Sequence, residues 1–411
     1  MEEVLPVKTT TLSPRLAYAL AAAVIGLSLF ASVTPSPLYG TYSELWGFSP
    51  AVLTLVYATY AFGVLTTLIL AGRISDEVGR RPVLLVALGS LLVTTIVYML
   101  ADSVAWLFVA RLLQGLATGL SLAAASAALL DLHPRRDPLS AGLANGVASA
   151  GGIALGMLVS STAVEFLPAP RVVPYVVLFT LFAVAFAGAL LMPEPVTNRV
   201  RPRLTPQRPG VPPVVRRQFL LAGLGVLSSW SIGGLFFSLG PALSAAIFDT
   251  GNHFVTGLPV VVLAGSGAVA QVVFGRTAPW LGTSAGSIAL AFGVLVIVLA
   301  SAEDSAALLL IGSLIGGSGF GVAFLGSLRQ LVGAIPTQHR AEVMSAFYVV
   351  AYSSLSVPAI LAGILVTPLG LETTFEIFGS VVAAIAVVLA LEAWRTRPQS
   401  QPVRIGFESA S

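Results

Sequence analysis

Long apolar runs fill most of the chain, and short segments that contain charged residues, proline or glycine separate them. A run of roughly 20 mostly apolar residues can cross the hydrocarbon core of a bilayer as a helix. Runs with such boundaries predict twelve membrane-spanning helices. We expect them at about residues 15–38, 51–71, 82–101, 105–130, 139–163, 172–192, 218–247, 256–274, 281–301, 306–333, 341–366 and 371–394.

One long polar stretch, residues 193–217, interrupts this pattern and is rich in proline and arginine. Such a composition is typical of a linker rather than of a helix. It predicts a six-helix bundle over residues 1–192, a cytoplasmic linker over 193–217 and a second six-helix bundle over 218–394. Residues 395–411 then form a cytoplasmic tail.

The composition supports the membrane assignment and excludes several classes of protein. Hydrophobic residues make up 56% of the chain and charged residues 9%, against about 25% charged residues in a typical soluble domain. These values exclude a soluble enzyme and a nucleic-acid-binding protein, although the net charge is +3. The chain has no cysteine, which removes thiol catalysis, disulfides and thiolate metal sites.

The basic residues predict the orientation of the helices. With the N-terminus in the cytoplasm, all of the 21 basic residues except Arg111, Arg171 and Arg329 lie on the cytoplasmic side. This asymmetry is expected of a multi-pass protein of the cell membrane, because basic loops stay inside. Both termini are therefore predicted to be cytoplasmic.

The two halves of the chain also repeat one another. Gly72 and Gly79, in the loop after the second expected helix, recur about half a chain later as Gly275 and Gly282. A parallel repeat of two six-helix halves is typical of transporters, whose substrate site lies between the halves near the middle of the membrane.

The loop between the second and third expected helices reads GRISDEVGRRP. It resembles the signature loop of the major facilitator superfamily, G-x-x-x-D-x-x-G-R-R-x, with Gly72, Asp76, Gly79, Arg80 and Arg81 at the fixed positions. The resemblance implies an all-α integral membrane protein with the major facilitator fold, a central cavity and alternating access. It also implies that the aspartate and an arginine latch the two halves together on the cytoplasmic side. Arg80 and Arg81 have an alternative role as simple topology signals.

A second motif lies in the fourth expected helix, where Arg111, Gln114 and Gly115 match the R-x-x-Q-G pattern of the same family. A charge this deep in the membrane is costly unless it meets a partner or water. The resemblance implies a role for Arg111 in proton coupling, or in binding the charge of a substrate. The alternative is that its side chain extends to the membrane surface.

The fifth expected helix is rich in glycine. Its pattern faintly resembles the glycine motif of the family's antiporters, but the proline of that motif is missing. Ordinary close packing of helices is the alternative explanation. The glycines concerned are Gly142, Gly146, Gly151, Gly152 and Gly156.

Polar and aromatic side chains within the spans are candidates for the wall of the cavity. Asn145 and Gln271 lie deep in apolar runs, where an unpaired amide is costly. The aromatic candidates could instead belong to the interfacial belts, and the amides could join neighbouring helices. The candidates are Tyr57, Asn145, Trp230, Gln271, Tyr348 and Tyr352.

No Asp or Glu lies near the middle of any expected span. This favours a neutral, amphipathic or anionic substrate, and it leaves proton coupling without an evident carrier, so facilitated diffusion is an alternative. A P-loop requires a lysine, and the only lysine is Lys8, which argues against ATP hydrolysis by this chain. An intramembrane enzyme would need a nucleophile and base, or a metal cluster, at depth, and the sequence offers neither.

The sequence therefore predicts a secondary transporter, not an enzyme, that moves a small organic molecule across the cytoplasmic membrane. Export of a drug or metabolite is the leading interpretation, and uptake of a sugar or organic anion is the alternative. The expected partners are the substrate, the lipid bilayer and a proton as candidate coupling ion. We expect a monomer with no nucleic acid, cofactor or metal.

Overall fold

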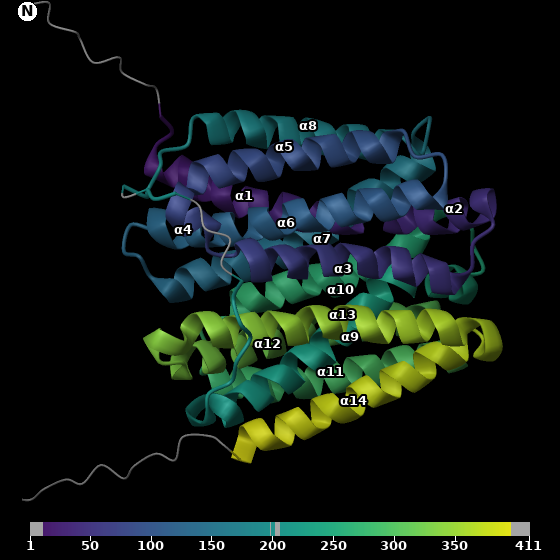
Figure 1. Ribbon diagram of the computed structural model, residues 1–411. Coiled ribbons are helices and arrows are strands. Elements are labelled where there is room, and N and C mark those ends of the chain that lie inside the picture. The colour runs from purple at the N-terminus through teal and green to yellow at the C-terminus, as the bar shows by residue number, and fades with distance from the viewer. Residues whose placement is uncertain (1–10, 198, 202–205, 396–411) are drawn as a thin grey trace, which may run out of the picture.

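The computed structural model describes residues 11–197, 199–201 and 206–395. In this part of the chain the regular structure is entirely helical (Figure 1). The first half contains α1 (Pro14–Val33), α2 (Tyr39–Trp46), α3 (Pro50–Ala71), α4 (Ile74–Val78), α5 (Arg80–Met99), α6 (Val104–Leu132), α7 (Pro138–Phe166) and α8 (Val173–Leu190). The second half contains α9 (Arg216–Phe248), α10 (His253–Phe274), α11 (Pro279–Ala302), α12 (Ala306–Ala334), α13 (Arg340–Leu369) and α14 (Leu371–Arg395). Short 3₁₀ turns lie at Ser36–Leu38, Pro213–Val215 and Thr337–His339.

Twelve helical segments among the described residues are long and apolar enough to cross a membrane, which confirms the predicted number. Eleven begin and end within a few residues of the expected positions. The first differs, because α1 stops at Val33 and the segment continues through a 3₁₀ turn into α2. Pro35 and Pro37 explain the break, since neither has an N–H to donate to the carbonyl four residues before it.

Polar caps fix where several of these helices begin. Ser49, Asp137, Asn252 and Ser305 accept hydrogen bonds from backbone N–H groups in the first turns of α3, α7, α10 and α12. The Asp137 carboxylate accepts bonds from the hydroxyl of Ser140 and from backbone N–H groups, and these bonds lower its pKa. Such caps satisfy the free N–H groups of a helix where it leaves the apolar region.

The spans form two six-helix bundles, drawn purple to teal for the first half and teal-green to yellow for the second (Figure 1). The bundles meet along two seams, where α7 packs along α10 and α3 packs along α13. We call the end that holds the linker and the starts of α1 and α9 the linker face, and the end that holds α2 the loop face. The domain boundaries 1–192, 193–217, 218–394 and 395–411 stay a prediction, because residues 1–10, 198, 202–205 and 396–411 lie outside the described part.

Small residues let helices approach closely within each bundle. A Cβ atom on Gly152 of α7 would lie 2.1 Å from the carbonyl oxygen of Gly26 in α1. A Cβ on Gly156 would lie 2.6 Å from the carbonyl oxygen of Phe30. A Cβ on the adjacent Gly151 meets nothing within 4 Å. Gly152 and Gly156 therefore act in the packing of α7 against α1.

This difference between neighbours gives a matched test. We expect Gly152→Ala to destabilise the protein by about 1–3 kcal/mol, the usual cost of overpacking. Gly151→Ala should be neutral or stabilising by up to about 1 kcal/mol, because alanine is the better helix former. Thermal unfolding of both variants in nanodiscs checks this, and an equal loss in both would contradict the close approach of α1 and α7.

Candidate functional site

A cavity of about 420 Å³ lies between the two bundles. This volume is within the range of sites for small organic molecules. Its wall extends toward the linker face, where it includes Gly72 at the end of α3, Gln207 of the linker and Met344 near the start of α13.

All six cavity candidates from the sequence line this one space. They come from α3, α7, α9, α10 and α13, so both bundles contribute to the wall. The six are Tyr57, Asn145, Trp230, Gln271, Tyr348 and Tyr352.

The two amides also join helices. Asn145 Nδ2 donates to Ser126 Oγ of α6 at 2.7 Å, and Asn145 Oδ1 accepts from Ser149. Gln271 reaches from α10 to α7, where its Oε1 would lie 2.4 Å from a Cβ on Gly146. Each amide therefore lines the cavity and also contacts another helix. The two roles expected from the sequence, lining the cavity and joining helices, are compatible.

The lining differs between the two sides. The second bundle supplies an aromatic wall, in which Trp230 packs edge-on against Tyr352 at 5.2 Å and tilted against Phe324 at 5.7 Å. The first bundle supplies the polar side chains of Ser126, Asn145 and Ser149 from α6 and α7, together with Tyr57 and Tyr60 from α3. No charged residue is among the described residues that line the cavity.

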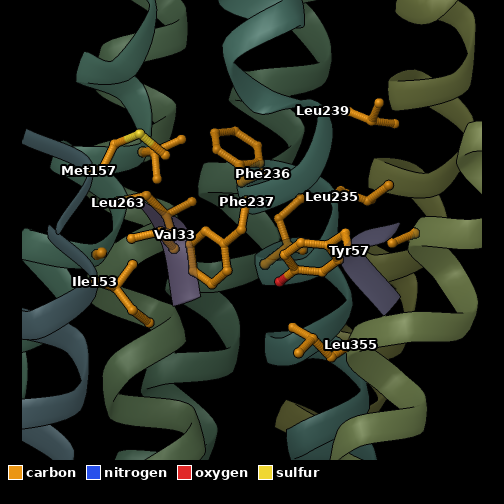
Figure 2. Close-up of a cluster of buried hydrophobic side chains, with 14 of the residues drawn as sticks. Val33, Tyr57, Ile153, Met157, Leu235, Phe236, Phe237, Leu239, Leu263 and Leu355 are labelled. Atoms are coloured by element: carbon orange, nitrogen blue, oxygen red, sulfur yellow. The ribbon is translucent and has the colours of Figure 1, made fainter. Parts of the chain in front are cut away.

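A hydrophobic cluster closes the cavity toward the loop face (Figure 2). Tyr57, Ile153 and Phe237 belong both to this cluster and to the cavity wall. Met157 and Leu239 lie one turn or less beyond them along α7 and α9, and belong to the cluster alone. The cluster draws on both bundles, so it can open only if the bundles separate at this end.

Hydrogen bonds across the seam reinforce the closure at the loop face. The Glu165 carboxylate at the end of α7 accepts from Asn252 Nδ2 at 2.9 Å and from the His253 backbone N–H at 2.8 Å. It thus lies at the positive end of α10. Ser36 Oγ, in the 3₁₀ turn after α1, also joins the bundles, because it donates to the carbonyl of Phe237 in α9 at 2.7 Å.

Arg111 lies behind the cavity wall and is fully buried. Its Nη1 donates to the Ser32 carbonyl at 2.7 Å and to Gln114 Oε1 at 2.8 Å. Its Nε donates to the Tyr39 hydroxyl at 2.9 Å, and Nη2 contacts the same oxygen. The side chain is therefore held inside the first bundle rather than extended to the membrane surface.

Tyrosine rings complete the surroundings of this guanidinium. Its central carbon lies 5.5 Å from the ring centre of Tyr39, 5.7 Å from that of Tyr57 and 5.6 Å from that of Tyr60. These contacts are cation–π interactions. No carboxylate of the described residues forms an ion pair with Arg111.

The break in the first span explains how the cation is stabilised without a carboxylate. Pro35 cannot donate to the Ala31 carbonyl, which instead accepts from Gln114 Nε2 at 2.8 Å. The carbonyl of Ser32, in the last turn of α1, accepts from Arg111. The negative end of a helix favours a cation, so the end of α1 takes the place of an acidic partner.

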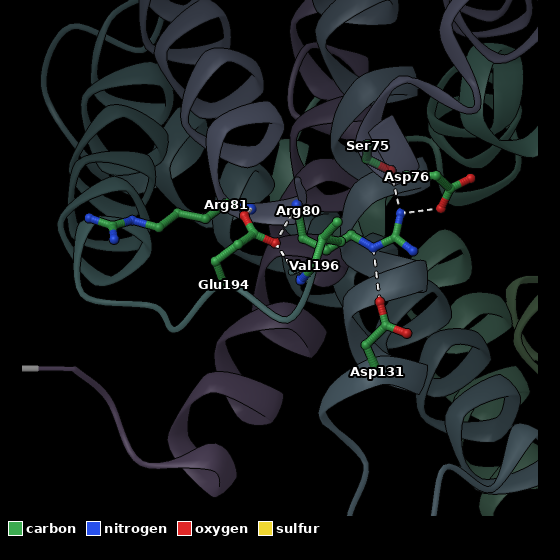
Figure 3. A network of polar contacts seen from close by, with 7 residues as sticks. All are labelled: Ser75, Asp76, Arg80, Arg81, Asp131, Glu194 and Val196. Atoms are coloured by element: carbon green, nitrogen blue, oxygen red, sulfur yellow. Dashed lines mark hydrogen bonds and ion pairs between the residues drawn. The ribbon is translucent and has the colours of Figure 1, made fainter. Parts of the chain in front are cut away.

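The signature loop forms a compact ionic network at the linker face (Figure 3). Arg80 Nη1 contacts Asp76 Oδ1 at 2.5 Å, and Arg80 Nε donates to Asp131 Oδ2 of α6 at 2.9 Å. Ser75 Oγ also accepts from Arg80, at 2.8 Å. Asp76 thus pairs with Arg80, and the side-chain partners of Arg80 all lie in the first half of the chain.

Glu194 of the linker, which the sequence reasoning did not identify, closes this network. It accepts from the backbone N–H groups of Arg80 at 2.9 Å and Arg81 at 3.0 Å, and so caps α5. A Cβ on Gly79 would lie 2.5 Å from the Glu194 carboxylate, and the φ of Gly79 is +113°. Both observations require glycine at this position. The guanidinium of Arg81 donates to the carbonyl of Leu190.

The linker also bridges the two bundles. The Gln207 backbone N–H donates to the carbonyl of Ile69 in α3 at 3.0 Å. The Gly210 backbone N–H donates to the carbonyl of Glu342 in α13 at 3.2 Å. Glu342 pairs with His339 at 2.7 Å. The polar, proline-rich composition of the linker does not predict these contacts.

The architecture and the signature loop agree with a family model described as "Major Facilitator Superfamily", which matches residues 18–359. The chain belongs to the major facilitator superfamily. It is thus a multi-pass membrane protein of a family of transporters, not of a family of enzymes.

The similarity to individual proteins covers much less of the chain than the family match. The chain is 30% identical to "Multidrug resistance protein MdtL" of Klebsiella pneumoniae over 102 residues, which are 25% of this chain and 26% of that protein. It is 31% identical to the protein of the same name from Escherichia coli O157:H7 over 100 residues, 24% of this chain and 26% of the relative. The similarity therefore spans about a quarter of these relatives.

Two solved structures share the fold of this superfamily member. The human organic anion transporter MFSD10 (TETRAN) has a TM-score of 0.67 at 19% identity, with 92% of this chain and all of that chain covered. A POT family transporter in complex with 5-aminolevulinic acid has a TM-score of 0.72 at 13% identity, with 93% and 96% covered. At these identities the likeness concerns the fold alone.

The hydrogen bond between Arg111 and the Tyr39 hydroxyl can be tested by its effect on stability. Tyr39→Phe removes a hydroxyl that accepts from the buried cation, so we expect a loss of about 1.5–3 kcal/mol of stability. Tyr57→Phe is the matched control, because the Tyr57 ring contacts Arg111 but its hydroxyl does not bond to it, and it should change stability by less than about 0.5 kcal/mol. Unfolding of both variants in nanodiscs measures this, and equal effects would contradict the assigned hydrogen bond.

Proposed function

We propose that this protein is a secondary transporter that exports a small organic molecule by alternating access, with the linker face in the cytoplasm. The observation that carries the proposal is the cavity between the bundles, which reaches the linker face and is closed toward the loop face. A site enclosed by two repeats is the arrangement in which rocking of one bundle against the other changes access.

The contacts at the two ends support this movement. At the loop face, Glu165 and Ser36 hold the bundles together through a few hydrogen bonds. At the linker face, Arg80 pairs with Asp76 and Asp131 within its own bundle. We infer that this ionic network meets the second bundle when the loop face opens, and that the basic residues of the linker face keep it in the cytoplasm.

The direction of transport rests on the partial relatives. Both are named multidrug resistance proteins, and the similarity supports export of a small molecule by this chain. Arg111 and Gln114 form a polar network next to the cavity wall, and we propose that the fixed charge of Arg111 acts on the charge of the substrate. Neither side chain releases a proton near neutral pH, so neither is itself the proton carrier. We propose that the protein acts as a monomer.

The direction is tested in oriented membrane vesicles. Cells that lack or overproduce the chain are first screened with drugs and metabolites, and a compound whose toxicity changes is then followed in vesicles. We expect accumulation in inverted vesicles and none in right-side-out vesicles, with dependence on a proton gradient. Accumulation only in right-side-out vesicles would replace export with uptake.

The same vesicles test the ionic network. Asp76→Asn should slow turnover severalfold and leave substrate affinity nearly unchanged, because Asp76 contacts Arg80 and does not line the cavity. Glu372→Gln, at an exposed position on the loop face, is the control for loss of one acidic charge. Normal turnover in Asp76→Asn would remove the proposed role of the network.

A further inference from the structure

The aromatic side chains of the cavity carry hydrogen-bond donors that the protein leaves unused. Among the described residues, the hydroxyls of Tyr57, Tyr348 and Tyr352 and the indole N–H of Trp230 have no hydrogen-bond partner. None of these four atoms is among the buried atoms without a partner, and all four residues line the cavity. In contrast, the amide N–H of Asn145 is bonded to Ser126. The unpartnered groups of the wall thus include three tyrosine hydroxyls, which can donate or accept, the indole N–H of Trp230, which only donates, and the amide oxygen of Gln271, which accepts.

The shape of the wall favours a flat ligand. Trp230 and Tyr352 meet at an interplanar angle of 87°, and Trp230 and Phe324 at 42°, so their rings form a box rather than a stack. Aromatic molecules pack well against such edges and faces. A bicyclic ligand fits easily in about 420 Å³.

The electrostatic surroundings are positive. The wall contains no charged residue among those described, and the nearest buried charge is the guanidinium of Arg111 behind the Tyr57 and Tyr60 rings. Arg111 has no ion-pair partner among the described residues, so its charge is only partly compensated by dipoles. A fixed charge in a region of low dielectric acts over several ångströms.

An aromatic box can also bind a quaternary ammonium group. Two features weigh against a cation here. The indole N–H of Trp230 can present only a positive hydrogen atom to the ligand, and Arg111 adds a positive potential from behind the same wall. A cation would therefore meet repulsion where an oxygen acceptor meets attraction.

We propose that the cavity binds aromatic molecules that carry oxygen acceptors and are uncharged or anionic, and that it discriminates against organic cations. This substrate class rests on the proposed transport function. Tyr348 and Tyr352 donate to the oxygen acceptors, and Trp230 packs on the ring system.

Binding to the full chain in nanodiscs tests the proposal at equilibrium, without any flux. The probes are 2-naphthoate, methyl 2-naphthoate and 2-naphthylmethylammonium, which share one ring system, and empty nanodiscs correct for partition into lipid. We expect the acid and the ester to bind at least tenfold more tightly than the ammonium. Equal or tighter binding of the ammonium, or no binding of any probe at millimolar concentration, would overturn the proposal.

Three variants test which residues produce the preference for the acid and the ester over the ammonium. The double variant Tyr348→Phe, Tyr352→Phe keeps both rings and should weaken binding of the acid and ester about tenfold. Tyr42→Phe, which loses a hydroxyl bonded to Tyr175 away from the cavity wall, should leave it unchanged. Asn145→Asp places a carboxylate in the wall and should strengthen ammonium binding at least tenfold.

Unchanged affinity in the double phenylalanine variant would overturn the role of the hydroxyls, and a melting temperature near that of the unchanged chain shows that each variant is folded. The test also separates the two proposals. If the ammonium binds as tightly as the acid and the ester, but vesicles still transport the compound found in the screen, only the proposed substrate class is wrong. If the preference is found and no flux occurs, only the transport proposal fails.

Discussion

The hydrocarbon of a membrane offers no hydrogen bonds, so a polar group in this protein has to find its partner inside the fold. Arg111 shows the constraint most clearly, because the broken end of α1 and the Tyr39 hydroxyl hold its charge, and no carboxylate of the described residues pairs with it. Many serine hydroxyls follow the same rule, as when Ser244 donates to the carbonyl of Gly240 one turn before it. Six other buried serine hydroxyls have no partner among the described residues. Against this background, free donors gathered in one cavity indicate a place for a ligand.

The two ends of the molecule use different chemistry, and this difference makes movement possible. The loop face closes through an apolar cluster and a few neutral or dipolar bonds, such as that between Glu165 and the start of α10. The linker face holds the Asp76–Arg80–Asp131 network within one bundle. Among the described residues, neither end holds the two bundles together by a large buried ion network. A small difference in the free energy of substrate binding can therefore shift the equilibrium between the state open at the linker face and the state open at the loop face.

Hydropathy was sufficient to predict twelve spans and most of their ends, because length and apolar content are local properties. The pairing of Asp76 with Arg80 was also predictable, since the two residues are four apart. The partners of Arg111 were not predictable, because the Ser32 carbonyl becomes free only where Pro35 breaks the helix. The contacts of Glu165 and Gln207 join segments distant in sequence, and nothing in their local surroundings indicates them.

The most direct test of alternating access uses the absence of cysteine from the chain. A single Ala123→Cys variant places a thiol on the cavity wall, and Leu155→Cys, on the exposed side of α7, is the control. A membrane-impermeant maleimide should label Ala123→Cys rapidly from the linker face and slowly from the loop face. Adding Glu165→Ala should speed labelling from the loop face. Labelling from the loop face alone, or a rate from that side that Glu165→Ala leaves unchanged, would contradict the account.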